Sequence, residues 1–451
     1  MSKLNGDVLC LIFEELRDDE KALLSCLSIN KTFCEIIIPI LWKNPWKFLR
    51  KGKDRLLLNV ILSHLSNESK NNLIQNNILI NSYQRPLFDY ISFCRHLNLN
   101  VIQRIIYSLH EESKAKIIEN ELLNLFISEN MKYTHLYLPY QFNFQIHCIL
   151  GANSCLSEIK FLSCNASVEN NVLDGLTEIC KLIKEVEIYF ERCNNYGISR
   201  LIETQKKLFS ICLLDSYKNY GSFHEIIENS LIKHANTIQY LRIQKPPVTN
   251  ILSSFVNLKV LELEFNGDNR VYKYLEKLFL PFLQILRTRF VPINILINLI
   301  KNTTGTLIDI SIKSSMSNSV DNNKKIIESI YQKCPNLKYL KLLLRNKGIL
   351  ELEKLLITCQ YLDELCLFDY DEIDLNNLFK ILARSSPTGL FKFKFSFSQI
   401  EFDSLELFFD NWKGRHPMIL QFERQTEDID VLIEKYKSEG IIKSYSGGLV
   451  L

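Results

Sequence analysis

The sequence lacks long apolar runs. No apolar stretch approaches the ~18 residues that a membrane-spanning helix needs, and the best one, IIIPILW at residues 36–42, contains a proline. The apolar run at residues 8–13 is short and is followed by Glu14 and Glu15, which is unlike a secretory signal. We therefore predict a soluble protein with no export signal and no membrane partner.

The sequence also lacks the short motifs of common enzymes. GxSxG, GxxxxGK[ST] and GxGxxG are absent, which excludes the usual nucleophile elbow, P-loop and dinucleotide fingerprint. The string HEIIE at residues 224–228 has no second histidine, and its spacing is typical of an exposed helix surface. We predict no catalytic residues, no metal ligands and no cofactor; an enzyme whose site is dispersed along the chain is the remaining alternative.

Neither charge sign dominates, because 54 Lys and Arg against 51 Asp and Glu leave a net charge of +3. Nucleic acid is therefore not the expected partner. The basic segment at residues 46–55 has the composition of a nuclear signal or a nucleic-acid patch, but a solvated connection after the motif is the favoured interpretation. The 13 cysteines include no CxxC pair, which indicates free thiols and a reducing compartment, the cytoplasm, the nucleus or both.

A length of 451 residues predicts several domains or a repeat array. From about residue 131 the spacing L-x-x-L-x-L recurs with starts 20 to 30 residues apart, which is the period of leucine-rich repeats. The copies begin at Tyr133, Leu156, Ile183, Leu208, Ile238, Leu258, Leu283, Leu307, Leu337, Leu362 and Leu390. In the copy that starts at Leu156, Phe161 is the last apolar position and is predicted to point inward. Cys164, three residues later, is predicted to occupy the turn, as Asn266 does in a later copy.

The segments between these copies have helical periodicity. Apolar residues recur at intervals of three and four positions in residues 326–334, 349–359 and 377–387. Pro335 ends the first of these predicted helices. Alternating strands and helices predict an α/β fold in which an irregular leucine-rich-repeat solenoid, a horseshoe, exposes its strands on one face. An ordinary α/β domain is the alternative.

Three short apolar helices are predicted in the first 46 residues, which is too small a unit for a large core. Burial of a large apolar side chain is worth roughly 1.5–3 kcal/mol, so apolar residues left in water favour a partner surface. A helix that caps the end of the repeat array is the alternative.

The order of residues over positions 2–46 resembles the F-box, in particular the fungal form that ends in PILW.NPW. The matching positions are Leu4, Asp7, Val8, Leu9, Ile12, Phe13, Leu16, Leu24, Cys26, Ile29, Asn30, Phe33, Pro39, Leu41 and Trp42. Asn5 stands where the family usually has proline, and Phe33 where it usually has tryptophan.

This resemblance implies a three-helix motif that binds the Skp-type adaptor of a cullin-based ubiquitin ligase. The residues expected to contact the adaptor are Leu4, Val8, Leu9, Ile12, Phe13, Leu16, Leu24, Ile29, Phe33, Pro39, Leu41 and Trp42. We therefore expect an F-box over residues 1–46, a helical linker over 47–130, the solenoid over 131–440 and a tail or cap over 441–451.

Strand residues that alternate with the apolar ones point away from the core. In this sequence they carry acidic groups in early repeats and basic groups in later ones, a pattern that favours orientation and specificity in protein binding. The predicted substrate-binding residues are Glu185, Glu187, Tyr189, Tyr240, Arg242, Glu262, Glu264, Arg287, Arg289, Tyr339, Lys341, Lys392 and Lys394. The expected function is a substrate receptor of a ubiquitin ligase; a leucine-rich-repeat scaffold or inhibitor outside a ligase is the alternative.

Overall fold

The structure is a computed structural model. It describes residues 5–78, 86–190, 195–215, 223–265, 272–313, 320–369, 373–397, 400–423 and 427–447. The chain forms two compact units, residues 1–208 with 215–230, and residues 209–214 with 231–451. Within the described ranges, no helix combines the length and the apolar character that crossing a bilayer requires.

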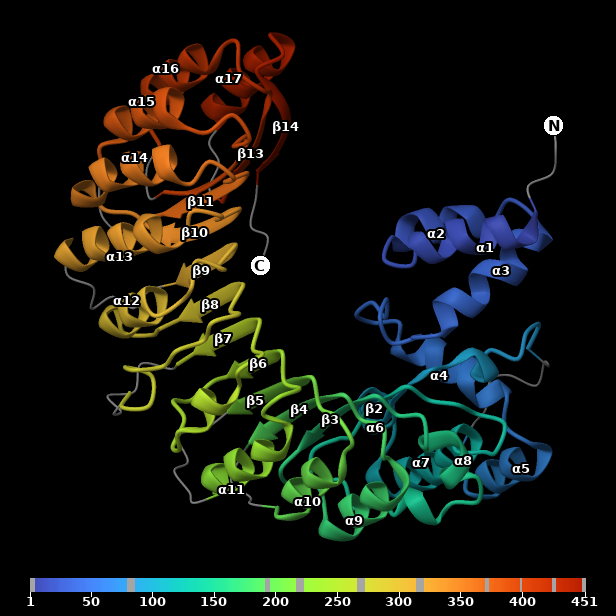
Figure 1. The fold of residues 1–451 in the computed structure, drawn as a ribbon. Helices are drawn as coiled ribbons and strands as arrows, with labels where there is room; N and C mark the ends of the chain where they lie inside the picture. Colours follow the sequence, from blue (N-terminus) through green and yellow to red (C-terminus); the bar gives the residue numbers. More distant parts are fainter. Residues whose placement is uncertain are drawn as a thin grey trace. The chain divides into compact units, whose positions relative to one another are not determined.

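The first unit begins with three short helices (Figure 1). They are α1 (Gly6–Glu15), α2 (Glu20–Leu27) and α3 (Lys31–Trp42). Each helix begins at a side chain that accepts a backbone N–H, respectively Asn5, Asp19 and Asn30. Such N-caps satisfy donors that a helix leaves unpaired, so the sequence itself divides this segment into three helices.

More helices follow, and then the first strand. They are α4 (Asp54–Ser63), α5 (Asn67–Gln75), η1 (Ile91–Phe93), β1 (His96–Asn98), α6 (Leu99–Leu109) and α7 (Glu112–Phe126). The predicted helical linker over residues 47–130 therefore contains the first strand of the sheet, because β1 pairs in parallel with β2 (His135–Tyr137). Cys94, Leu97 and Leu99 are buried and keep the repeat spacing, with cysteine in the first apolar position.

The first unit continues with a regular alternation of strands and helices. Its remaining elements are η2 (Ile146–Cys148), α8 (Ala152–Leu156), β3 (Phe161–Asn165), α9 (Asn170–Ile179), β4 (Glu185–Phe190), α10 (Gly197–Thr204) and α11 (Phe223–Ser230). Strands β1 to β4 lie in sequence order and are parallel. Helices lie on one side of these strands, which is the arrangement of a leucine-rich-repeat solenoid (Figure 1).

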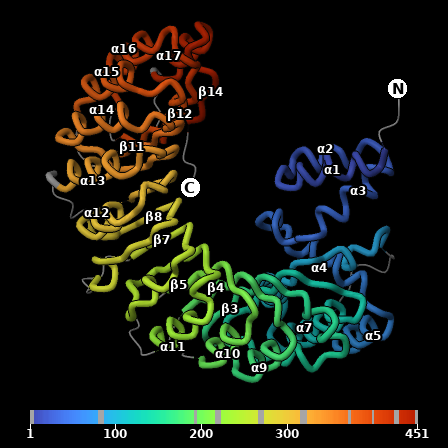
Figure 2. The backbone as a smooth tube through the Cα atoms, viewed as in Figure 1, coloured from blue at the N-terminus to red at the C-terminus, as the bar shows by residue number. Residues whose placement is uncertain are grey.

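The second unit repeats this architecture, and its backbone forms successive similar coils (Figure 2). It opens with β5 (Ser210–Asp215), which belongs to this unit up to Leu214. Its other strands are β6 (Tyr240–Ile243), β7 (Val260–Glu264), β8 (Ile285–Arg289), β9 (Asp309–Lys313), β10 (Tyr339–Leu343), β11 (Glu364–Phe368), β12 (Lys392–Ser396), β13 (Met418–Phe422) and β14 (Ile442–Gly447).

The helical elements of the second unit connect these strands. They are η3 (Leu231–His234), η4 (Ile251–Ser254), α12 (Ile293–Lys301), α13 (Val320–Lys333), η5 (Asn346–Gly348), α14 (Ile349–Thr358), α15 (Leu375–Ser385), α16 (Phe402–Trp412) and α17 (Glu427–Ser438). Helices α13, α14 and α15 confirm the predictions for residues 326–334, 349–359 and 377–387. Strand β14 lies in the predicted tail or cap and pairs with β13.

Buried strand residues confirm the predicted spacing. Leu340 pairs with Ile310 and with Leu365 across adjacent strands, and all three are buried. One copy was assigned the wrong phase: in β3, Leu162 aligns with Leu136 of β2, so Ile159, Leu162 and Cys164 face the core. Phe161 therefore points away from the core, and Cys164 is a strand residue and not the turn residue; Asn266 lies outside the described residues.

The cysteines of the described residues are free thiols, in agreement with the prediction. Burial raises the pKa of the Cys94, Cys164 and Cys334 thiols to about 12. Thiols with so high a pKa are poor nucleophiles and poor metal ligands at neutral pH. They act as small apolar side chains inside the repeats.

Candidate functional site

The N-terminal three-helix motif has a small core of its own. Leu9 and Phe13 of α1 are buried against Leu23 of α2 and Ile37 of α3. The rings of Phe13 and Phe33 meet edge to face with centroids 5.1 Å apart. Three more predicted adaptor contacts, Leu16, Phe33 and Leu41, are partly buried against this core. Leu9 and Phe13 therefore stabilise the motif and do not offer a surface to a partner.

The two departures from the F-box pattern both have structural roles here. Asn5 is the N-cap of α1, and its side chain accepts a hydrogen bond from the Asp7 backbone N–H at 3.4 Å. Phe33 fills the core beside Phe13. The asparagine thus starts the helix, and the phenylalanine supplies an aromatic side chain to the core.

The other side of the motif exposes apolar side chains. Val8, Leu11 and Ile12 of α1 are 41%, 70% and 43% exposed, and the spacing of three and four residues places them on one helix face. Leu24 and Ile29 are 44% and 60% exposed. Leu11 was missed as a site residue, although its spacing from Val8 already indicated the shared face. Leu4, another predicted adaptor contact, lies outside the described residues.

The end of α3 anchors the motif to the first strand. The Trp42 ring lies 4.7 Å from that of Tyr90. The Trp46 indole Nε1 donates to the backbone oxygen of His96 at 2.7 Å, and the Arg95 backbone N–H donates to the Lys43 oxygen at 2.9 Å. The end of the motif thus has a structural role inside the first unit, and Pro39 lies one turn before Trp42 in α3.

The basic segment that follows the motif is partly neutralised. Lys47 forms an ion pair with Asp18, and Arg50 forms one with Glu20 at 3.1 Å. Both acidic residues belong to the loop and helix start between α1 and α2. These ion pairs favour the interpretation of the basic segment as a solvated connection, because two of its positive charges already pair with acidic residues of the motif.

The predicted substrate-binding residues occupy outward positions of their strands. Register aligns Arg242, Glu262 and Arg287 across β6, β7 and β8, and it aligns Lys341 with Lys394 through Cys366 of β11. All thirteen are half-buried or exposed. The alternation of apolar and polar residues along each strand therefore predicted correctly that these side chains lie on the open face of the sheet.

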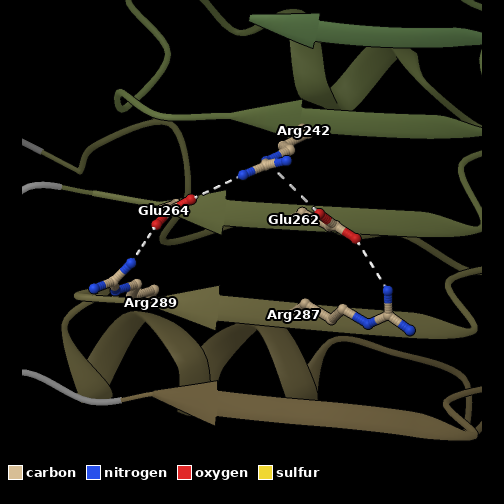
Figure 3. Close-up of polar contacts among 5 residues, drawn as sticks. All are labelled: Arg242, Glu262, Glu264, Arg287 and Arg289. Atoms are coloured by element: carbon tan, nitrogen blue, oxygen red, sulfur yellow. Dashed lines mark hydrogen bonds and ion pairs between the residues drawn. The ribbon is translucent and has the colours of Figure 1, made fainter. Parts of the chain in front are cut away.

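Five of these side chains pair with one another in the second unit (Figure 3). Glu264 accepts from Arg242 at 3.1 Å and from Arg289 at 2.9 Å. Arg287 donates to Glu262 at 3.2 Å and to Asp309 at 2.9 Å. We call these five residues together with Asp309 the ion-pair ladder. Its members are Arg242, Glu262, Glu264, Arg287, Arg289 and Asp309.

The ladder lowers the pKa of Glu264. Burial alone would raise the pKa of Glu264, but hydrogen bonds from Arg242 and Arg289 outweigh it and hold that pKa below its usual range. Glu262 and Glu264 were predicted as acidic contacts for a substrate. Their charges are instead compensated by arginines of the neighbouring strands, so this part of the face is rigid and nearly neutral.

An aromatic stripe lies on the open face of β1 to β3. The rings of His96 and His135 stack with centroids 3.7 Å apart and planes 13° apart, and Tyr137 lies 5.1 Å from Phe161. Burial, and then the positive charges of His135, Lys43 and Lys47, lower the pKa of His96 to about 4. The sequence did not indicate this stripe, because no strand was predicted at residues 96–98 and Phe161 was predicted to face the core.

The chain shows no metal centre within the residues described. No group of three or more His, Cys, Asp or Glu side chains there could hold an ion. In the HEIIE string, His224 Nε2 lies 3.3 Å from Asp215 Oδ1, and Glu228 is buried. The string was predicted to be an exposed helix surface. Glu225 is exposed as predicted, whereas His224 is half-buried beside Asp215 and Glu228 is buried.

No protein-family model matches the chain, and neither does any curated protein. Among solved structures, one similar to this chain is the leucine-rich repeat-containing protein LegL7 from Legionella pneumophila. The two share 14% identity with a TM-score of 0.38, over 63% of this chain and 90% of that one.

Proposed function

We propose that the chain is a non-catalytic substrate receptor of a Skp-cullin-F-box type ubiquitin ligase in the cytoplasm, the nucleus or both. In this proposal the three N-terminal helices bind the adaptor and, through it, a cullin. The open face of the strands binds a protein substrate. The leucine-rich-repeat architecture supports the second part, because such arrays present extended surfaces on their strands.

The observation that carries the adaptor proposal is the outer face of α1. Val8, Leu11 and Ile12 remain exposed on one face of α1, while Leu9 and Phe13 on another face of the same helix fill the core. Apolar patches of this kind on small folded units mark interaction sites, because they are costly to leave in water. An apolar helix face fits a helical partner with a complementary groove.

The test measures binding of the full-length chain to a purified Skp-type adaptor. Leu11→Glu and Ile12→Glu place a charge in the proposed interface and should each weaken binding by about 2 kcal/mol, or roughly 30-fold. The motif should stay folded because neither side chain belongs to its core. Val431→Glu is the matched control, since Val431 is 74% exposed on α17 of the second unit.

Adaptor binding that survives both substitutions would contradict this proposal. The second candidate is a leucine-rich-repeat scaffold or inhibitor outside a ligase. It is favoured by the same open strand face, and it would be supported if the wild-type chain binds no Skp-type adaptor yet captures a protein through its repeats.

A further inference from the structure

A pocket of about 360 Å³ opens on the strand face of the second unit. Its walls come from strands β8 to β12 and the segments that follow them, and its lining includes Arg289, Lys313 and Lys341. We call it the cationic pocket. Its size suits one side chain or a chain terminus and not a folded domain.

Three adjacent strands supply its positive charges. Arg289 of β8 and Lys313 of β9 are register partners, and Lys341 of β10 pairs with Ser311 two residues before Lys313. Arg289 is already compensated by Glu264 at 2.9 Å. Lys313 and Lys341 make no ion pair with any residue that the structure describes. Two ammonium groups therefore share the pocket without a bound carboxylate.

The acidic residues of the pocket have other partners. Glu423 accepts a hydrogen bond from Ser396, and its carboxylate lies 3.9 Å from Lys394. Asp369 is buried, and its backbone N–H donates to the Ser396 oxygen at 3.3 Å. Partial removal from water lowers the pKa of Lys313, and the charges of Lys341 and Arg289 lower it further; the carboxylates of Glu264 and Glu423 act in the opposite direction but do not reverse the shift. The pocket thus has a surplus of positive charge that an anion would relieve.

The backbone at the pocket is held in an uncommon conformation. Phe290 has a φ of 56°, in the left-handed region that bulky residues avoid. Its N–H donates to the Lys313 oxygen at 3.0 Å, and the Arg289 guanidinium lies 5.0 Å from its ring. Residues held in this region cluster at binding sites, where the surrounding structure fixes them. Here the conformation places an aromatic wall beside the cations.

We infer that the cationic pocket binds an anionic group, a carboxylate or a phosphate, carried by the protein that the strand face binds. The inference rests on the proposed function, because the bound protein supplies the anion. An ammonium pair recognises either group by charge, and the aromatic walls contributed by Phe290 and Phe368 exclude water around it.

The test titrates the full-length chain with inorganic phosphate and, separately, with acetate at constant ionic strength. Binding is measured from the rise in Tm with anion concentration, since a ligand of the folded state stabilises it by mass action. Lys313→Gln and Lys341→Gln should each weaken anion binding at least tenfold. Lys338→Gln is the matched control: it removes the same charge from an exposed lysine outside the pocket and should change binding less than twofold.

Phosphate binding without acetate binding would identify a phosphorylated side chain, acetate binding without phosphate binding would identify a carboxylate, and binding of both would support a general anion site. The inference is overturned if neither anion binds, or if Lys338→Gln weakens binding as much as the pocket variants. Adaptor binding is measured on the same samples. If the wild-type chain binds the adaptor but neither anion, the pocket inference alone is refuted, whereas anion binding without adaptor binding refutes the proposed function.

Discussion

The open face of β1 to β4 and the open face of β9 to β13 differ in chemistry although the same repeat builds both. The first has the stacked rings of His96 and His135 and the acidic Glu185 and Glu187. The second has lysines on β9, β10 and β12. The difference shows that the repeat fixes the inward positions of each strand and leaves the outward ones free to vary.

The region between these two in sequence, β6 to β8, shows a third outcome. Its outward charges pair across strands in the ion-pair ladder (Figure 3). Side chains opposite each other on adjacent strands lie within reach of one another, so charges of opposite sign compensate there. Charges of one sign, as at Lys313 and Lys341, make no ion pair with the residues that the structure describes.

The largest expected effect comes from breaking the feature that both faces share, the inward leucine. Leu340 is fully buried in β10, and Leu340→Asp should destabilise the second unit by about 4 kcal/mol because it buries an unpaired charge. Urea unfolding followed by tryptophan fluorescence measures this, since Trp412 is buried in that unit. Lys341→Asp, one residue along on the open face, is the control and should cost far less. Equal losses would contradict the assigned strand orientation.

A second prediction concerns the histidine stack of the first unit. The pKa of His96 is lowered from 6.5 to about 4, so the unfolded chain binds a proton between these values that the folded chain does not. The first unit should therefore lose stability as pH falls from 6.5 to 4, by at most about 1.4 kcal/mol per pH unit and less where solvent screens the half-buried ring.

His96→Gln should flatten this pH dependence. Urea titrations at pH 7 and pH 5 measure it, in a Trp412→Phe background so that Trp42 and Trp46 report on the first unit. His416→Gln, at an exposed histidine of the second unit, is the control. Burial also lowers the pKa of His135, so a smaller slope of the same sign should remain; a slope as steep as that of the wild type would show that His96 does not cause it.

The smallest expected effect belongs to the ion-pair ladder. Arg242→Ala removes a partner of Glu264 and should cost the second unit about 1 kcal/mol at pH 7. The pKa of Glu264 is lowered from 4.5, so this contribution is present above pH 4.5 and is lost as pH falls through the lowered value. Urea unfolding at pH 7 and pH 3 measures the difference between variant and wild type.

Arg200→Ala is the matched control for the ladder. Arg200 pairs with Asp174 at 2.7 Å in the first unit, and both side chains are well exposed. An isolated surface pair of this kind contributes about 0.5 kcal/mol or less. A loss as large as that of Arg242→Ala would mean that the network adds nothing to its separate pairs.

The sequence predicted the repeats and most of their phase, because the L-x-x-L-x-L spacing is local and burial requires it. It missed β1, where cysteine takes the first apolar position at Cys94, and it misplaced Phe161, where Ile159 offered a competing phase. Both errors arise because a small cysteine and a half-buried aromatic residue fit either side of a short strand.

The sequence by itself determined which residues of most strands point inward and that α1 is apolar on more than one side. Only the tertiary structure decided that Leu9 and Phe13 fill the core while Val8 and Leu11 face outward, since α2 and α3 select which side of α1 is covered. It also decided that Glu264 is compensated while Lys313 is not. The physical reason is that lateral neighbours on the sheet lie 20 to 30 residues apart in the chain, beyond the reach of any local pattern.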